Sequence, residues 1–218
     1  GIWSDAHLPG LERLARAIRA TGGLSAVQIY HGGCRAAREL IDDTPRAPWD
    51  DAETGARALA TAEVEQLVED FILAAVRAER AGFDGVEVHG AHGYLLAQFL
   101  DADNNRRGDR YGGCFENRAR VLFEIIDGIR LRTGPDFQLG VRLSPERFGV
   151  TMAEALALAE RVMGCAKVDY LDMSLWDAFK EPAEPAWHGR PLIDWFAALP
   201  RAGTRLGVAG KIMDAATA

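Results

Sequence analysis

The sequence has few cysteines and no excess of basic residues, and both shortages narrow the classes of protein to consider. Cys34, Cys114 and Cys165 are too few and too widely spaced for a disulfide framework, so we expect reduced thiols and a cytoplasmic location. The 25 lysines and arginines are outnumbered by 32 aspartates and glutamates. The resulting net charge of −7 argues against binding to nucleic acid or to an anionic membrane surface.

Long apolar runs and the common short catalytic motifs are also missing. No run approaches the roughly 20 apolar residues that span a bilayer, and the chain does not open on a basic segment followed by an apolar one. The motifs G-x-G-x-x-G, G-x-x-x-x-G-K-[ST], H-E-x-x-H, C-x-x-C and G-x-S-x-G are absent. Membrane spans, a nucleotide-binding loop, a zinc hydrolase and a serine hydrolase are therefore not supported, and we expect a small-molecule ligand.

What remains is an ordinary globular composition, 48% apolar and 26% charged, arranged as alternating helices and strands. Short apolar runs predict strands over residues 26–30, 84–90, 139–143, 170–174 and 205–210. Apolar residues at helical spacing predict helices over residues 8–21, 61–82, 116–134, 151–163 and 192–199. Because helices long enough for right-handed crossovers separate the strands, we expect one α/β domain, residues 1–218, around a parallel sheet.

The ends of two of these helices carry recognisable signals. Thr61 is expected to cap one helix and Gly82 to end it in the left-handed conformation, and Thr151-x-x-Glu154 has capping-box spacing. The closing residues 216–218 read as part of a further helix, which predicts that the chain is a piece of a longer polypeptide.

Polar residues at the ends of the predicted strands favour a barrel over a doubly wound open sheet. Gln28, His89, Arg142, Ser174 and Gly210 each lie toward the C-terminal end of a different apolar run. Residues gathered at the carboxyl rim from many strands are typical of an eight-stranded α/β barrel, whereas an open sheet concentrates its ligand contacts at one switch point.

The densest group of chemically active side chains is His89, His92 and Tyr94. Two imidazoles three residues apart can donate hydrogen bonds to one acceptor atom, and the phenol can donate a proton. The alternative is that these residues are hydrogen-bonded or packed parts of the core. A zinc site resembling H-x-x-H with a nearby cysteine lacks a third and fourth ligand at suitable spacing, so no metal is expected.

Gln28 and Arg142 are polar residues within apolar stretches, and each needs a partner if buried. A ligand with a hydrogen-bonding edge would supply one. For Arg142, an ion pair with Glu87 or Asp172 is an equally good interpretation. The charged, glycine-ended loop over residues 101–113 reads, on composition alone, as a solvated surface loop.

The stretch Gly85–Arg120 carries three motifs, which are G-V-E-V-H-G-A-H-G-Y-L-L-A-Q-F-L, N-x-R-x-D-x-Y-G-G and E-N-R-x-R. With these motifs the stretch closely resembles the old yellow enzyme family of flavin-dependent oxidoreductases. Gln28-x-x-His31-x-Gly33 resembles the family's third-strand motif, and G-V-R-L-S-P from Gly140 resembles its fifth-strand motif. One departure is Cys34, which stands where the family has an arginine, with Arg35 one place later.

The resemblance implies a (β/α)8 TIM barrel that holds FMN at its carboxyl rim and reduces activated alkenes with NADH or NADPH. By position, Gln28 and Arg142 would bind the polar edge of the flavin ring, and Gly210 and Lys211 its phosphate. His89 and His92 would bind the carbonyl oxygen of an unsaturated substrate, and Tyr94 would protonate the alkene carbon.

The resemblance also implies an incomplete barrel, because the chain covers about strands 3 to 7 of the eight. Five strands cannot close such a barrel, and its exposed strand edges would favour instability or association as a homo-oligomer. Two alternatives follow. The chain is a truncated remnant or binding module without stable flavin, or it comes from an amine dehydrogenase or dienoyl-CoA reductase within the same family.

Overall fold

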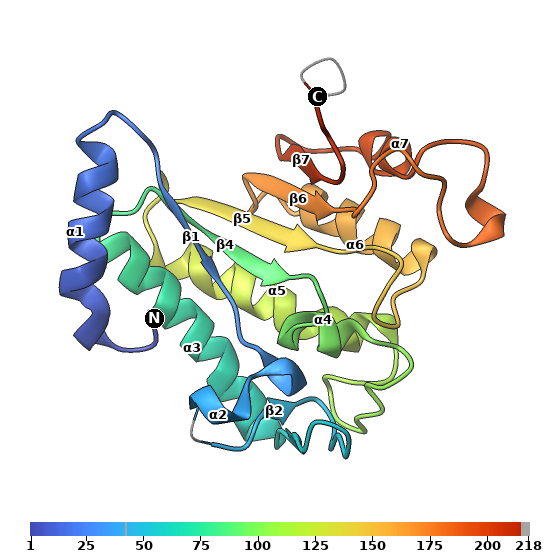
Figure 1. The fold of residues 1–218 in the computed structure, drawn as a ribbon, viewed down its shortest axis with the longest axis horizontal. Coiled ribbons are helices and arrows are strands. Elements are labelled where there is room, and N and C mark those ends of the chain that lie inside the picture. The colour runs from blue at the N-terminus through green and yellow to red at the C-terminus, as the bar shows by residue number, and fades with distance from the viewer. Residues whose placement is uncertain (42, 215–218) are drawn as a thin grey trace.

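The protein is built on one parallel sheet of five strands, seen in a computed structural model that describes residues 1–41 and 43–214. The strand order is β1-β4-β5-β6-β7, so neighbours in the sheet follow one another along the chain (Figure 1). The strands are β1 (Ala26–Ile29), β4 (Gly85–Gly90), β5 (Gln138–Leu143), β6 (Tyr170–Ser174) and β7 (Arg205–Ala209). All five predicted strands are confirmed to within one residue at either end.

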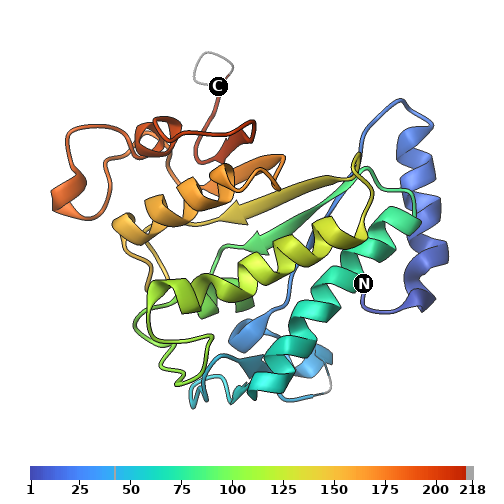
Figure 2. The ribbon, with the colours of Figure 1, turned by 180° about the vertical axis from the view of Figure 1, so that it is seen from behind.

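The longer helices α3 (Thr61–Arg80), α5 (Phe115–Arg132) and α6 (Met152–Gly164) cover one face of the sheet, as the view from behind shows (Figure 2). Helix α1 (Leu8–Arg19) precedes β1 and packs against α3, and the six-residue helix α7 (Leu192–Ala197) precedes β7. Shorter pieces are α2 (Arg38–Ile41), α4 (Leu95–Leu100), the pair β2 (Arg46–Ala47) and β3 (Arg57–Ala58), and 3-10 turns at Asp5–His7, Gly33–Arg35 and Pro185–Trp187. The helical reading of residues 216–218 lies outside the described residues.

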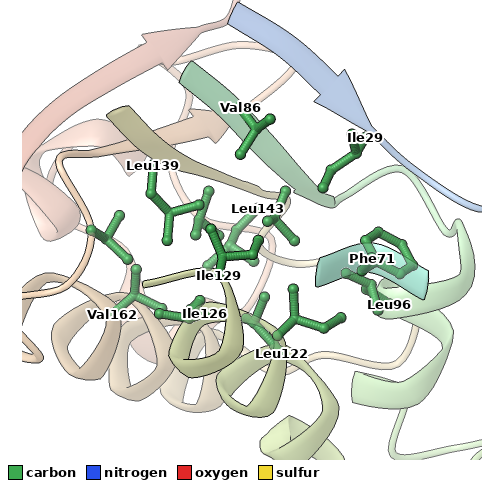
Figure 3. Packing of buried hydrophobic residues seen from close by; sticks show 14 of the residues in the cluster. Ile29, Phe71, Val86, Leu96, Leu122, Ile126, Ile129, Leu139, Leu143 and Val162 are labelled. Carbon is green, nitrogen blue, oxygen red and sulfur yellow. The ribbon is translucent and has the colours of Figure 1, made fainter. Parts of the chain in front are cut away.

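The core lies between the sheet and its covering helices (Figure 3). Val86 on β4 and Leu139 and Leu143 on β5 point toward Ile126 and Ile129 of α5, and all five are essentially inaccessible to solvent. Burying each such side chain contributes about 1.5–3 kcal/mol to the stability of the fold. Because successive strand residues point to opposite faces, this apolar face leaves the alternate, largely polar residues on the other side of the sheet.

The helix signals are confirmed at two of the three predicted places. Gly82 has a φ of 88°, and the Thr151 hydroxyl accepts a hydrogen bond from the Glu154 amide at 3.2 Å. The expectation for Thr61 is wrong, because Ala60 occupies the N-cap and Thr61 is the first helical residue. The Thr61 hydroxyl instead donates to Asp109 at 2.7 Å.

The loop over residues 101–113 is exposed along much of its length, as its composition indicates, but buried residues anchor it. Asp101, Asn105 and Tyr111 are buried. The Arg107 guanidinium donates to the carbonyls of Pro48 and Leu59 and pairs with Asp109. These contacts dock the loop beside β2, β3 and the start of α3, while Asp103, Arg106 and Arg110 are exposed. No helix in residues 1–41 and 43–214 combines the length and the apolar character needed to cross a membrane.

Candidate functional site

Two rows of polar side chains cross the sheet face that the helices leave uncovered. In the parallel register, His89 on β4 is level with Arg142 on β5, which is level with Asp172 on β6. Nearer the N-terminal ends of the strands, Gln28 on β1 is level with Glu87 on β4. Polar residues that lie far apart in the sequence therefore share one surface near the carboxyl ends of the strands.

His89 is the most deeply buried of the predicted site residues. Its side chain is 3% exposed, and neither ring nitrogen has a hydrogen-bond partner. Burial, reinforced by nearby His92 and Arg142, lowers the pKa of His89 to about 4. The imidazole is therefore neutral at physiological pH, with one N–H to donate and one nitrogen to accept. An unsatisfied buried polar group is costly, so this ring is suited to a ligand that supplies the missing partner.

The buried state of His89 predicts that the protein becomes less stable in acid. The unfolded imidazole takes up a proton near pH 6.5, whereas the folded one does so only near its pKa of about 4. The free energy of unfolding therefore falls as the pH is lowered through this window. We expect that fall to be about 3 kcal/mol larger in the wild type than in His89→Gln, measured by urea unfolding at several pH values. Equal falls in both proteins would contradict this prediction.

His92 follows β4 in a left-handed backbone conformation, with φ of 60°. Such a conformation is held by its surroundings: Arg35 donates to the His92 carbonyl, and the His92 amide donates to the Ser144 hydroxyl at 3.3 Å. The ring reaches across β5, where Nε2 lies 2.7 Å from the hydroxyl of Ser174 on β6. Its centroid lies 4.9 Å from that of His89, so the two imidazoles share one site.

Tyr94 completes this group from the N-cap of the short helix α4. Its ring centroid lies 5.5 Å from His89 and 5.3 Å from Tyr30, which follows β1 and is 61% exposed. Tyr30 is not among the site residues that the sequence predicts. The signal was available, because Tyr30 lies two residues after Gln28 and side chains at that spacing point to the same face of a strand.

Arg142 makes the ion pair that the sequence left open, and its partner is Asp172 rather than Glu87. Its Nε lies 3.1 Å from Asp172 Oδ2, but the N–H does not point at that oxygen closely enough to form a hydrogen bond. Its Nη2 donates to Ser174 at 3.4 Å. Gln28 instead donates to Glu87 at 2.5 Å. Ser174 thus joins Arg142 to His92, which the sequence did not indicate.

Gly210 and Lys211 lie beyond the end of β7, at the opposite edge of the sheet from β1. The Gly210 carbonyl accepts a hydrogen bond from the Ala178 amide at 3.1 Å, and a Cβ at Gly210 would lie 2.9 Å from the same nitrogen. The Lys211 ammonium is exposed and pairs with Asp177 at 3.2 Å. The two residues therefore share a rim with the imidazoles but are separated from Gln28 by the width of the sheet. Within the part of the chain that the structure describes, no group of three or more potential metal ligands occurs.

Comparisons with known proteins identify the family. The model of the NADH:flavin oxidoreductase / NADH oxidase family matches residues 1–189. The chain is 41% identical over 187 residues to a probable NADH-dependent flavin oxidoreductase of Bacillus subtilis, covering 81% of this chain and 50% of that protein. It is 38% identical over 179 residues to 12-oxophytodienoate reductase 2 of Arabidopsis thaliana, covering 72% of this chain and 47% of that protein.

The solved structures show the same relationship at the level of the fold. An old yellow enzyme homologue from Zymomonas mobilis superimposes with a TM-score of 0.82 at 27% identity, covering 98% of this chain and 64% of that one. The expected fold is confirmed, and the five-stranded sheet is part of an incomplete TIM barrel. The chain spans about half the length of the curated relatives it matches.

These matches also confirm, for the family, FMN as the cofactor and NADH or NADPH as the electron donor. The family match covers residues 1–189, and this range includes the strands in parallel register and the two imidazoles at the end of β4. This chain belongs to the NADH:flavin oxidoreductase / NADH oxidase family, and old yellow enzymes are among its structural neighbours.

Proposed function

We propose that the protein to which this chain belongs is an FMN-dependent reductase of activated alkenes such as α,β-unsaturated carbonyl compounds. The observation that carries the proposal is His89, buried with two unpartnered ring nitrogens beside His92 and Tyr94. A carbonyl oxygen is the kind of acceptor that a neutral imidazole N–H satisfies. Relatives named as flavin oxidoreductases and as an oxophytodienoate reductase support this chemistry.

The uncovered face of the sheet suits a flat, polar-edged cofactor. Arg142 retains a guanidinium Nε without a hydrogen bond, and Gln28 presents an amide on the same face. These two residues would hold the polar edge of the ring, while Gly210 and Lys211 at the far edge would meet the phosphate. Their separation across the sheet is what an extended molecule such as FMN requires. When bound, FMN supplies the hydride that NADH or NADPH provides.

The side chains after β4 would then act on the substrate. His89 and His92 would both donate hydrogen bonds to its carbonyl oxygen, which draws electron density away from the alkene. Because its lowered pKa keeps His89 neutral, this polarisation uses a neutral N–H rather than a charge. Tyr94, whose ring is next to His89, would donate a proton to the alkene carbon nearer the carbonyl.

Two measurements on the purified protein test this proposal. We expect added FMN to bind, giving a yellow protein with quenched flavin fluorescence, and this complex to consume NADH or NADPH when cyclohexenone is present. The matched control is a saturated ketone of the same size, which should cause no consumption above the background reaction with oxygen. Protein that binds FMN without distinguishing the two ketones would contradict the alkene-reductase assignment.

Ser174 provides a milder test of the substrate end of the site. Removing its hydroxyl by Ser174→Ala leaves the His92 ring free to turn, because the 2.7 Å contact is lost. We expect phenol ligands, which place an oxygen at the carbonyl position, to bind about 5- to 10-fold more weakly, the cost of one hydrogen bond. Optical titration of the flavin-loaded protein measures this, and Ser144→Ala, which removes only a contact to the His92 backbone, is the comparison. Unchanged phenol affinity in Ser174→Ala would remove Ser174 from this role.

The second candidate function is a binding module without stable flavin. Among the described residues, β1 and β7 are the edges of the sheet and have no strand on their outer sides. An open sheet face with unpaired edges holds a cofactor less firmly than a closed barrel does. Protein that stays colourless with excess FMN would favour this candidate.

A further inference from the structure

A polar group below the imidazoles brings together residues of three strands on the uncovered face. Gln28 on β1 donates from Nε2 to Glu87 on β4, and the ring and hydroxyl of Tyr170 on β6 lie over Gly140, the residue of β5 that is level with Glu87. Tyr170 is two strands away from Glu87, with β5 between them. Gly140 of β5 makes this reach possible, because a Cβ there would lie 2.0 Å from the Tyr170 ring.

The chemistry of the carboxylate decides which end of the Gln28 amide faces it. An ionised carboxylate only accepts hydrogen bonds, so Gln28 must direct its NH2 group toward Glu87. The amide oxygen, Oε1, is then left as an acceptor on the far side of the group. The hydroxyl of Tyr170 stays protonated, because burial first and the Glu87 charge second raise the pKa of Tyr170.

We infer that Glu87, approached by Tyr170 across Gly140, is a positioning residue that orients the Gln28 amide toward the flavin. This inference deepens the proposed function and rests on it. The pyrimidine edge of a flavin carries an N–H between two carbonyl oxygens. An amide fixed with Oε1 outward can accept from that N–H, whereas a freely rotating amide presents its acceptor only part of the time.

Binding of FMN to four proteins forms a double-mutant cycle that tests the inference: the wild type, Glu87→Gln, Gln28→Ala and the double variant. A glutamine at 87 can pair with either end of the Gln28 amide and no longer selects one. We expect Glu87→Gln to weaken FMN binding about 5- to 10-fold, measured by quenching of flavin fluorescence. In the Gln28→Ala background, the same change should weaken binding less than about twofold.

Two further variants and one control make the test independent of a folding defect in Glu87→Gln. Tyr170→Phe removes only the hydroxyl, and Gly140→Ala displaces the Tyr170 ring, and each should weaken FMN binding about threefold. Glu69→Gln, at an exposed residue of α3 that pairs with Arg132, should leave binding unchanged.

The possible outcomes separate the inference from the proposed function. A wild type that does not bind FMN would overturn both. The positioning role alone would be overturned by a wild type that binds FMN in either of two cases. The first is that Glu87→Gln weakens FMN binding equally with and without the Gln28→Ala substitution. The second is that none of the variants Glu87→Gln, Tyr170→Phe and Gly140→Ala weakens FMN binding.

Discussion

Replacing Tyr94 by phenylalanine is expected to slow alkene reduction by about 100- to 10,000-fold, the usual range for loss of a positioned proton donor. Phenylalanine keeps the ring that packs beside His89 and Tyr30, so only the donated proton is lost. Reduction of the flavin by NADH or NADPH needs no proton from this phenol. Its rate should therefore stay nearly unchanged, and stopped-flow absorbance measures the two half-reactions separately.

Two comparisons make this result specific to proton donation. Tyr30→Phe removes the hydroxyl of the neighbouring, more exposed tyrosine and should change neither half-reaction by more than about twofold. The carbanion formed from a nitroalkene is already stabilised. Tyr94→Phe should therefore slow the reduction of a nitroalkene less than it slows the reduction of cyclohexenone. Equal slowing of both half-reactions by Tyr94→Phe would assign Tyr94 to binding rather than to proton transfer.

Replacing Arg118 by methionine is expected to lower the free energy of unfolding by about 3–5 kcal/mol, the range for breaking a buried ion pair from one side. The Arg118 side chain is 6% exposed. It donates to the carbonyls of Leu100 at 3.0 Å and Gly113 at 2.6 Å and pairs with Glu154. One guanidinium thus joins α5 to the end of α4, to the loop over residues 101–113 and to α6, and methionine would leave all three acceptors unpaired.

A matched substitution in the same helix is the control for Arg118. Arg132 pairs with Glu69 near the other end of α5, where both side chains are more than a third exposed. Exposed pairs contribute at most about 1 kcal/mol, so Arg132→Met should lower the free energy of unfolding by no more than that. Urea unfolding followed by circular dichroism measures both variants. Similar losses for Arg118→Met and Arg132→Met would show that the buried guanidinium has no special role.

Periodicity was a reliable guide to the elements of this fold because their apolar faces are long and regular. The helix over Thr61–Arg80 and the strand over Gly85–Gly90 lie where the spacing of apolar residues predicts them. Composition indicates the exposed part of the loop over residues 101–113 but not its buried anchors, because it does not show which charges are paired. Arg107 and Asp109 satisfy each other and nearby backbone groups, which allows these two charged side chains to lie largely out of solvent. That all 218 residues form a single domain stays a prediction.

The candidate site was predictable in its membership and much less so in its geometry. His89, His92 and Tyr94 could be grouped because they lie within six residues of one another. The tie from His92 to Ser174 could not be predicted, because it crosses β5 between residues 82 positions apart. Nor could spacing show that Tyr170 lies over Gly140 toward Glu87, since that placement depends on the missing side chain of Gly140 and on the parallel register of three strands.

The amino-acid sequence by itself determined the alternation of helix and strand, the apolar and polar faces of each element and the family to which the chain belongs. The elements follow from the period of apolar residues close together along the chain, and the family follows from the resemblance of several motifs to those of known members. Only the tertiary structure decided which partner Arg142 takes, that His89 is left without one, and how the Gln28 amide is turned. These depend on the register of neighbouring strands and on burial, which bring together residues that are distant in the sequence.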